Sequence, residues 1–345
     1  APAGRFADAA WELSHDRSTY LFGNRDDQEW EANMPPFGRV FPHPFGPADG
    51  KGFATFLTMS PAGDELTLDF AKVLIENESI GADAVTDYLS VSFSSTDYVG
   101  HVFGPSSLEA EDNILRLDRT LAELIEFVDD KVGLDNTLIV LSADHGGPDT
   151  PGYLNGLKIP AGYVNPGDWG KDAAIARIKT RFGIEGDLIA AYDHPYVYFS
   201  DDVKNNRKID QAALEAAVVE ELTRFHGVSL AVSSTALRHG KLPDTDIYRP
   251  VINNFNPKRS GEVFVVFEPN WFINDMEGLT VASTHGSPWK YDTYVPIVFA
   301  GAGLKPQTVD RRVQTVDVAV TLSTYMGIKP PSGSAGMPLT EVLEK

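Results

Sequence analysis

Apolar and polar positions follow a regular order in the middle of the chain. Residues 87–93 (DYLSVSF) and 137–142 (TLIVLS) are apolar runs of strand length, and residues 108–132 between them carry apolar side chains at helical spacing. A strand, a helix and a second strand of these lengths predict a βαβ unit, which implies parallel strands in one sheet.

The same reasoning extends to the rest of the chain. It predicts an α/β fold: a three-layer α/β/α sandwich with a mostly parallel sheet and an inserted small α+β lobe. Residues 1–154 and 279–345 are expected to form the α/β core, and residues 155–278 the lobe. The other elements expected are helices over residues 67–80, 171–181, 211–225 and 316–326, and strands over residues 196–200, 228–232, 262–267 and 294–300.

Length and composition restrict the classes of protein to consider. With 345 residues, 42% of them hydrophobic, the chain can bury a sizeable core. It has no cysteine, which excludes disulfides and thiolate metal sites, so a bound metal would be held by nitrogen and oxygen. No apolar run approaches the roughly 18 residues that a membrane span needs. The chain begins Ala-Pro-Ala-Gly, as a processed or trimmed chain would.

The charge balance bears on possible partners. Forty-nine acidic residues against 29 Lys and Arg give a formal net charge of −20. This charge repels nucleic acid and anionic membrane surfaces, so we expect neither as a partner. An anionic substrate would need a local positive charge, which bound divalent ions supply most simply.

Acids and histidines follow three separate apolar segments. Asp97 and His101 come after residues 87–93, Asp144 and His145 after residues 137–142, and His285 after a short apolar segment. Functional groups gather beyond the carboxyl ends of strands in open α/β sheets, so these side chains are expected at one edge. Imidazole and carboxylate are suitable ligands for zinc, manganese or iron, and two such ions would clamp a phosphoryl group.

A simpler interpretation competes for each residue. An Asp-His pair after a strand is commonly a turn or a helix cap, and only the joint occurrence of the three segments favours a metal site. Ser14, His15 and Asp16 are consecutive and cannot align as a catalytic triad. The remaining histidines are predicted to be packing or surface residues: His15, His43, His194, His226 and His239.

Three motifs carry a family resemblance. VSFSSTDYVGHVFGP, LIVLSADHGG and ASTHGSPWKYDTYVPIVFAG resemble the carboxy-terminal metal motifs of the alkaline phosphatase superfamily, in its single-chain bacterial phosphatase and type I phosphodiesterase/nucleotide pyrophosphatase branch. By that resemblance Asp97, His101 and His285 match the ligands of one zinc, and Asp144 and His145 match two ligands of a second.

The resemblance also implies an activity. It implies a phosphoric ester hydrolase with two zinc ions that cleaves small-molecule phosphate monoesters through a phosphoenzyme, in the periplasm or secreted. Ca²⁺ or Mg²⁺ are further possible ions. The alternatives that stay open are a phosphodiesterase or nucleotide pyrophosphatase, a cofactor-independent phosphoglycerate mutase and a sulfatase.

The sequence departs from the family pattern in its amino-terminal part. In the family, a strand with an aspartate ligand and a Thr or Ser nucleophile come first, and nothing before Trp11 can hold that region. The chain therefore resembles a carboxy-terminal portion, and the nucleophile is expected on a missing amino-terminal segment or another chain. Ser94, Ser95 and Thr96 are conceivable substitutes but fit strand-end packing better. Without a nucleophile, the chain alone would be a catalytically silent fragment.

Overall fold

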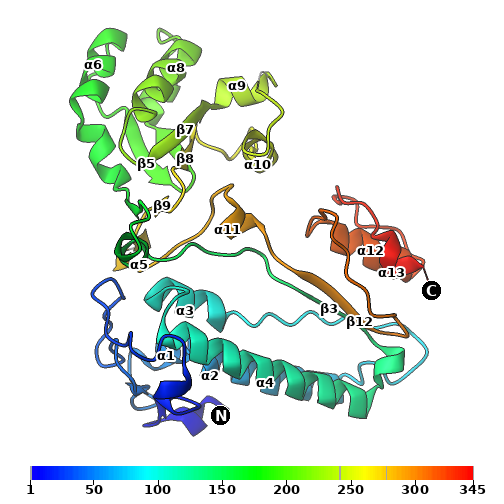
Figure 1. Ribbon diagram of the computed structural model, residues 1–345. Helices are drawn as coiled ribbons and strands as arrows, with labels where there is room; N and C mark the ends of the chain where they lie inside the picture. The colour runs from blue at the N-terminus through cyan, green and yellow to red at the C-terminus, as the bar shows by residue number, and fades with distance from the viewer. Residues whose placement is uncertain (1, 241, 277, 345) are drawn as a thin grey trace.

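Two long helices form the base of the molecule (Figure 1). The structure is a computed structural model that describes residues 2–240, 242–276 and 278–344. Helix α2 (Pro61–Asn77) begins with proline at its first position, and α4 (Leu108–Lys131) begins after Ser107, whose Oγ accepts the Ala110 N–H. Both features satisfy or remove free N–H groups at a helix start. The helices predicted over 67–80 and 108–132 are therefore confirmed, the first with an earlier start.

The strand predicted over residues 87–93 is wrong. Residues 86–94 form neither helix nor strand, and the side chain of Tyr88 is 70% exposed. The segment is extended between the helical base and β3 (Leu138–Ser142) in Figure 1. A strand exists only where a neighbour completes its ladder of hydrogen bonds, and no strand of the described residues pairs with this segment.

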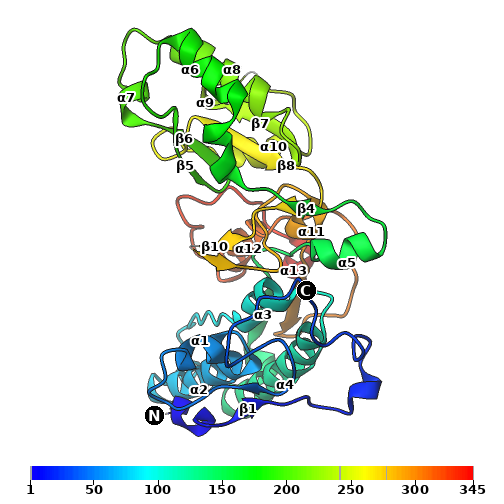
Figure 2. The ribbon, with the colours of Figure 1, turned by 90° about the vertical axis from the view of Figure 1, so that its left-hand side faces the viewer.

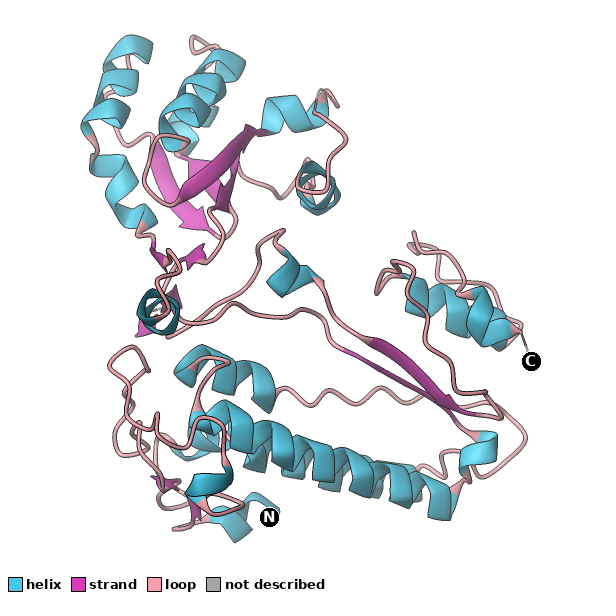
Figure 3. Ribbon diagram, viewed as in Figure 1, coloured by secondary structure: helices cyan, strands magenta, loops and turns pink. Residues whose placement is uncertain are grey.

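The core strand β3 pairs with β12 (Ile297–Gly301). This pair is antiparallel, with Leu141 opposite Val298, and among the described residues the parallel pairing is that of β4 (Gly162–Tyr163) with β9 (Trp271–Phe272). Helices α12 (Asp317–Tyr325) and α13 (Thr340–Leu343) lie on the side of the pair away from α2 and α4 (Figures 1 and 3). The fold is thus α/β, with helices on both sides of the core strands and with both antiparallel and parallel strand pairs.

A second body, the lobe, stands above the base (Figure 2). Its sheet has the order β5-β6-β8-β7 and its pairings are antiparallel. All five side chains of β8 are buried: Val263, Val265 and Phe267 join the cluster with α6 and α8, while Phe264 and Val266 join the cluster with α9 and α10. This alternation shows that helices cover both faces of the strand. The boundaries 155 and 278 for the lobe stay a prediction.

The lobe consists of β5 (Ile189–Asp193), β6 (Tyr196–Phe199), β7 (Val228–Ser233), β8 (Val263–Phe267), η4 (Pro166–Lys171), α6 (Ala173–Phe182), α7 (Asp201–Lys204), α8 (Gln211–Leu222), α9 (Ser234–Arg238) and α10 (Tyr248–Asn254). The other elements are η1 (Pro2–Phe6), β1 (Ala10–Trp11), η2 (Arg17–Thr19), β2 (His43–Pro44), α1 (Phe53–Thr58), α3 (Ser95–Phe103), η3 (Leu134–Asn136), α5 (Pro151–Gly156), β10 (Asp275–Met276), β11 (Leu279–Thr280) and α11 (Lys290–Thr293). Across the described ranges, no helix combines the length and apolar content required to cross a membrane.

Buried ionisable groups lie at the junction of α3 and α4. His43 and Glu109 are fully buried, with His43 Nε2 3.3 Å from Glu109 Oε1, and Glu31 is 4% exposed nearby. Burial lowers the pKa of His43 to about 4 and raises the pKa of Glu109 well above its usual range. Burial, reinforced by the neighbouring Glu109 carboxyl group, raises the pKa of Glu31 to about 9. The fold therefore favours the uncharged form of all three groups.

The raised pKa of Glu31 predicts a stability that falls with rising pH. The folded chain keeps a proton on Glu31 that the unfolded chain releases, so the contribution of Glu31 to stability is greatest below a pH of about 4.5 and declines up to about 9, by at most ~1.4 kcal/mol per pH unit. The Glu31→Gln variant has no proton to lose and should show a flatter profile. The measurement is the unfolding midpoint of both proteins between pH 5 and 9.

The exposed neighbour Glu29 provides the control. Glu29→Gln should follow the wild-type profile, because its carboxyl group is already in water. Parallel profiles for wild type and Glu31→Gln would contradict the account.

Candidate metal centre

Helix α3 brings two of the candidate residues together. Asp97 lies in its first turn and His101 in its last, four positions apart, which places both on one face. Val99, Val102 and Phe103 are buried against the aromatic core around Phe37 and fix the orientation of that face. The two residues were predicted to follow a strand, and the helix is what sets their spacing.

The ring of His101 is held in one tautomer. Its Nδ1 lies 2.7 Å from the Ser283 carbonyl oxygen, which can only accept, so Nδ1 carries the hydrogen. Nε2 of the neutral ring then keeps its lone pair, which is the state that a metal ion binds. The Ala282 N–H also donates to the His101 carbonyl, at 2.8 Å, and ties the segment before His285 to the end of α3.

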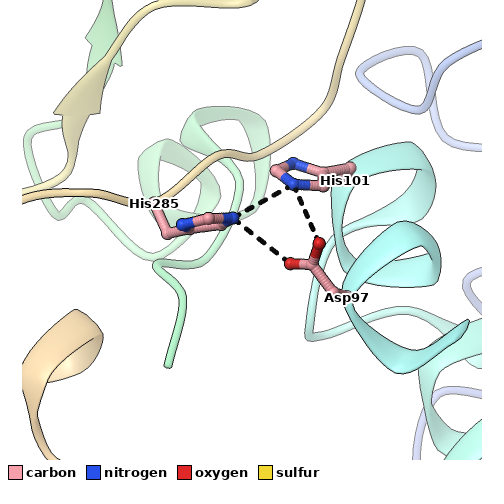
Figure 4. Close-up of side chains that lie close together, drawn as sticks. All are labelled: Asp97, His101 and His285. Atoms are coloured by element: carbon pink, nitrogen blue, oxygen red, sulfur yellow. Dashed lines mark hydrogen bonds and ion pairs between the residues drawn. The ribbon is translucent and has the colours of Figure 1, made fainter. Parts of the chain in front are cut away.

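His285 completes a convergent group of three (Figure 4). Its Nε2 lies 3.3 Å from Asp97 Oδ1 and 3.2 Å from His101 Nε2, while His101 Nε2 lies 3.4 Å from Asp97 Oδ2. Each residue offers one atom that could bind a metal ion, and these three atoms lie within 4.8 Å of one another. His101 is buried, and Asp97 and His285 are half-buried, so the group opens on one side.

The electrostatics of this group favour a cation. Burial alone would raise the pKa of Asp97, but its hydrogen bonds with His101 and His285 outweigh burial and hold that pKa well below its usual range. Burial would lower the pKa of His101, and the bond with Asp97 raises it instead. Two ring nitrogens that face each other at 3.2 Å repel unless a proton or a cation lies between them. Two imidazoles and a carboxylate suit zinc.

His145 lies beside this group. Its ring stacks on that of His285, with centroids 3.4 Å apart, and its Nε2 is 3.9 Å from Asp97 Oδ1. Its Nδ1 is 2.9 Å from the Gly146 carbonyl oxygen, which leaves Nε2 free to accept. Asp144 Oδ2 lies 3.6 Å from His145 Nε2, and its side chain is 88% exposed. These two residues therefore adjoin the group of three without joining it.

Asp292 organises the loop that carries His285, a role that the sequence reasoning missed. Its carboxylate is buried and accepts the N–H groups of Gly286 and Ser287 and the hydroxyl of Ser287. Its carbonyl oxygen accepts the Gly146 N–H, which joins this loop to that of His145. The available signal was its place inside the THGSPWKYD stretch, seven positions after His285.

Comparisons with known proteins identify a family for the chain. A family model described as type I phosphodiesterase / nucleotide pyrophosphatase matches residues 15–288, a range that includes all five candidate residues. The chain is 33% identical to the alkaline phosphatase PafA of Elizabethkingia meningoseptica over 96% of its length, and 32% identical to a protein named calcium-transporting ATPase from Myroides odoratus over 97%.

The crystal structure of PafA shares the fold. It aligns with 99% of this chain with a TM-score of 0.87. The chain spans 60% of the PafA sequence, 61% of the Myroides protein and 64% of the crystallised PafA chain. Because the family model covers most of the sequence, this chain belongs to the type I phosphodiesterase / nucleotide pyrophosphatase family.

Proposed function

We propose that this chain carries the metal-binding part of a phosphate monoesterase that uses two zinc ions. The observation that supports it best is the convergence of Asp97, His101 and His285, which come from two segments 184 positions apart. The similarity to a protein named alkaline phosphatase supports the choice of phosphate monoesters. Nothing in the geometry argues for the transport activity that the name of the Myroides protein describes.

The residues would divide between two ions. Asp97, His101 and His285 would hold one zinc, and Asp144 and His145 would contribute to the second. When bound, zinc acts as a Lewis acid that stabilises the charge developing on a transferred phosphoryl group. The protein groups around the site fix the ligands: the Ser283 carbonyl sets the tautomer of His101, and Asp292 holds the backbone next to His285.

None of the three hydroxyl groups in front of Asp97 suits the role of nucleophile. Ser95 is 3% exposed, and its N–H donates to Asp64. The Thr96 hydroxyl accepts from the Asn113 side chain at 2.9 Å, and the Ser94 hydroxyl lies 3.0 Å from that of Ser92. These contacts are those of packing and turn residues. We therefore propose that a further polypeptide segment supplies the nucleophile and another ligand of the second zinc.

The surface of the molecule supports a further segment. Its accessible area is 19,736 Å², whereas a compact monomer of 37.6 kDa exposes roughly 14,000 Å². Leu141 and Val298 sit opposite each other on β3 and β12 and are 45% and 47% exposed, on strands that helices cover in a closed α/β sandwich. About two fifths of each relative's length lies outside the match. Apolar helix faces from this segment would cover that surface.

The second candidate is a phosphodiesterase, which the description of the family model favours. Both activities would use the same ligands, so the distinction depends on the groups around the substrate rather than on the ligands. A periplasmic or secreted location stays a proposal that rests on the resemblance to bacterial alkaline phosphatases.

The zinc assignment predicts that one carboxylate matters far more than others. Replacing Asp97 with Asn removes the charge that faces both imidazoles and should weaken zinc binding on the order of 100-fold in titration calorimetry. Binding to wild type should strengthen with rising pH, because zinc displaces the proton whose affinity for His101 is raised.

Asp118→Asn serves as the control, because Asp118 is exposed on α4. It should bind zinc as wild type does. If Asp144→Asn abolished zinc binding while Asp97→Asn left it intact, the site that binds zinc more tightly would be the one at Asp144 and His145. That result would contradict the proposal.

The proposed activity predicts the properties of the protein isolated from its source. Its intact mass should exceed 37.6 kDa, it should contain two zinc ions, and it should hydrolyse p-nitrophenyl phosphate faster than bis-p-nitrophenyl phosphate or p-nitrophenyl sulfate. A faster diester reaction would favour the phosphodiesterase. A mass of 37.6 kDa with one zinc or none and no turnover would show that the chain is a silent fragment.

A further inference from the structure

His194 of the lobe contacts the loop that carries the candidate ligand His285. It lies in the turn between β5 and β6, and its Nε2 is 3.2 Å from the carbonyl oxygen of Gly286. Because this oxygen can only accept, Nε2 carries the hydrogen and donates it. Nδ1 then accepts from the Tyr192 hydroxyl at 2.7 Å. The neutral ring thus has both nitrogens engaged, although the sequence placed it among the packing or surface histidines.

The contact is close and leaves no room for a side chain at position 286. Gly286 has φ +110°, a conformation that residues with a side chain rarely adopt, and a Cβ there would lie 2.8 Å from His194 Nε2. Gly286 follows His285 directly in the chain. Its N–H group donates to Asp292, and its carbonyl oxygen accepts from His194. The backbone beside His285 is therefore held on both sides.

Two further hydrogen bonds join the same loop to the lobe. The Trp289 indole N–H donates to the Phe267 carbonyl oxygen at 3.0 Å, and the Asn270 N–H donates to the Tyr291 hydroxyl at 3.0 Å. Figure 2 shows α11, which carries Tyr291, directly below the lobe. Of the three loop residues that the lobe contacts, Gly286, the partner of His194, is the one directly next to His285.

We propose that His194 is a positioning residue, through which the lobe sets the orientation of His285 and thereby the metal affinity of the Asp97–His101–His285 site. The inference rests on the proposed zinc site. The competing explanation is that His194 only packs, because its ring stacks on Phe267 with centroids 6.0 Å apart. The two explanations differ in the part played by the hydrogen bond to Gly286.

Two substitutions at this position separate the hydrogen bond from the packing. Phe keeps an aromatic ring against Phe267 and lacks the N–H donor, while Gln keeps a donor and loses the ring. The His194→Phe variant should bind zinc about 10–100-fold more weakly in a chelator competition, the range for partners that orient a metal ligand. It should also shift the visible absorption bands of the cobalt-loaded protein. His194→Gln should stay within about threefold of wild type.

The control is His239→Phe, a replacement of an exposed histidine in the same lobe, which should match wild type. Wild-type zinc affinity in His194→Phe would overturn the inference, as would an equal loss in the Phe and Gln variants. Asp97→Asn in the same assay separates the two proposals. If it has no effect on zinc binding, the zinc site itself is wrong; if it weakens binding and His194→Phe does not, only the role of His194 is wrong.

A second variant covers the case in which His194→Phe does not fold. Tyr192→Phe removes only the hydroxyl that bonds Nδ1 and keeps the ring, so the imidazole loses the partner that fixes its orientation. It should weaken zinc binding about threefold or more while the protein still unfolds cooperatively. Unchanged zinc affinity in this variant would overturn the inference.

Discussion

The contact between His101 and residues 282 and 283 is the constraint on which the candidate metal centre depends. The His101 ring donates to the Ser283 carbonyl oxygen, and the His101 carbonyl oxygen accepts from Ala282, so one residue is bound through both its side chain and its backbone. The Tyr163 hydroxyl, at the end of β4, donates a further hydrogen bond to the Ala282 carbonyl oxygen. His285 follows two residues after Ser283, and this is why two imidazoles 184 positions apart can face one carboxylate.

Local patterns predicted the helices and part of the site. Helical spacing of apolar residues indicated α4 and α8, whose bounds agree with the predictions within three residues, because a helix closes its hydrogen bonds within its own segment. Helix α3, which places Asp97 and His101 on one face, was not predicted, because the two residues were expected only beyond the end of a strand. The strand expected over residues 87–93 failed for the opposite reason: its bonds depend on a partner strand, and the described residues offer none beside it.

The residues that position the candidate ligands could not be predicted from the sequence. Asp292 is one acid among 49 acidic residues, and only its burial beneath the His285 loop gives it three hydrogen bonds to accept. His194 is a similar case. One of its hydrogen-bond partners is the nearby Tyr192, but the other is Gly286, which lies 92 positions further along the chain. Such contacts depend on how the lobe sits against the core, which neither periodicity nor spacing encodes.

The position of the His285 loop between two bodies has a consequence for function. One side of the loop is bonded to the lobe through Gly286, Trp289 and Tyr291, and the other side joins the His145 loop through Asp292. A displacement of the lobe would therefore change the relation of His285 to Asp97 and His101, which α3 holds in the base. Substitutions in the lobe would then alter the geometry of the candidate metal centre even where they lie far from Asp97 and His101.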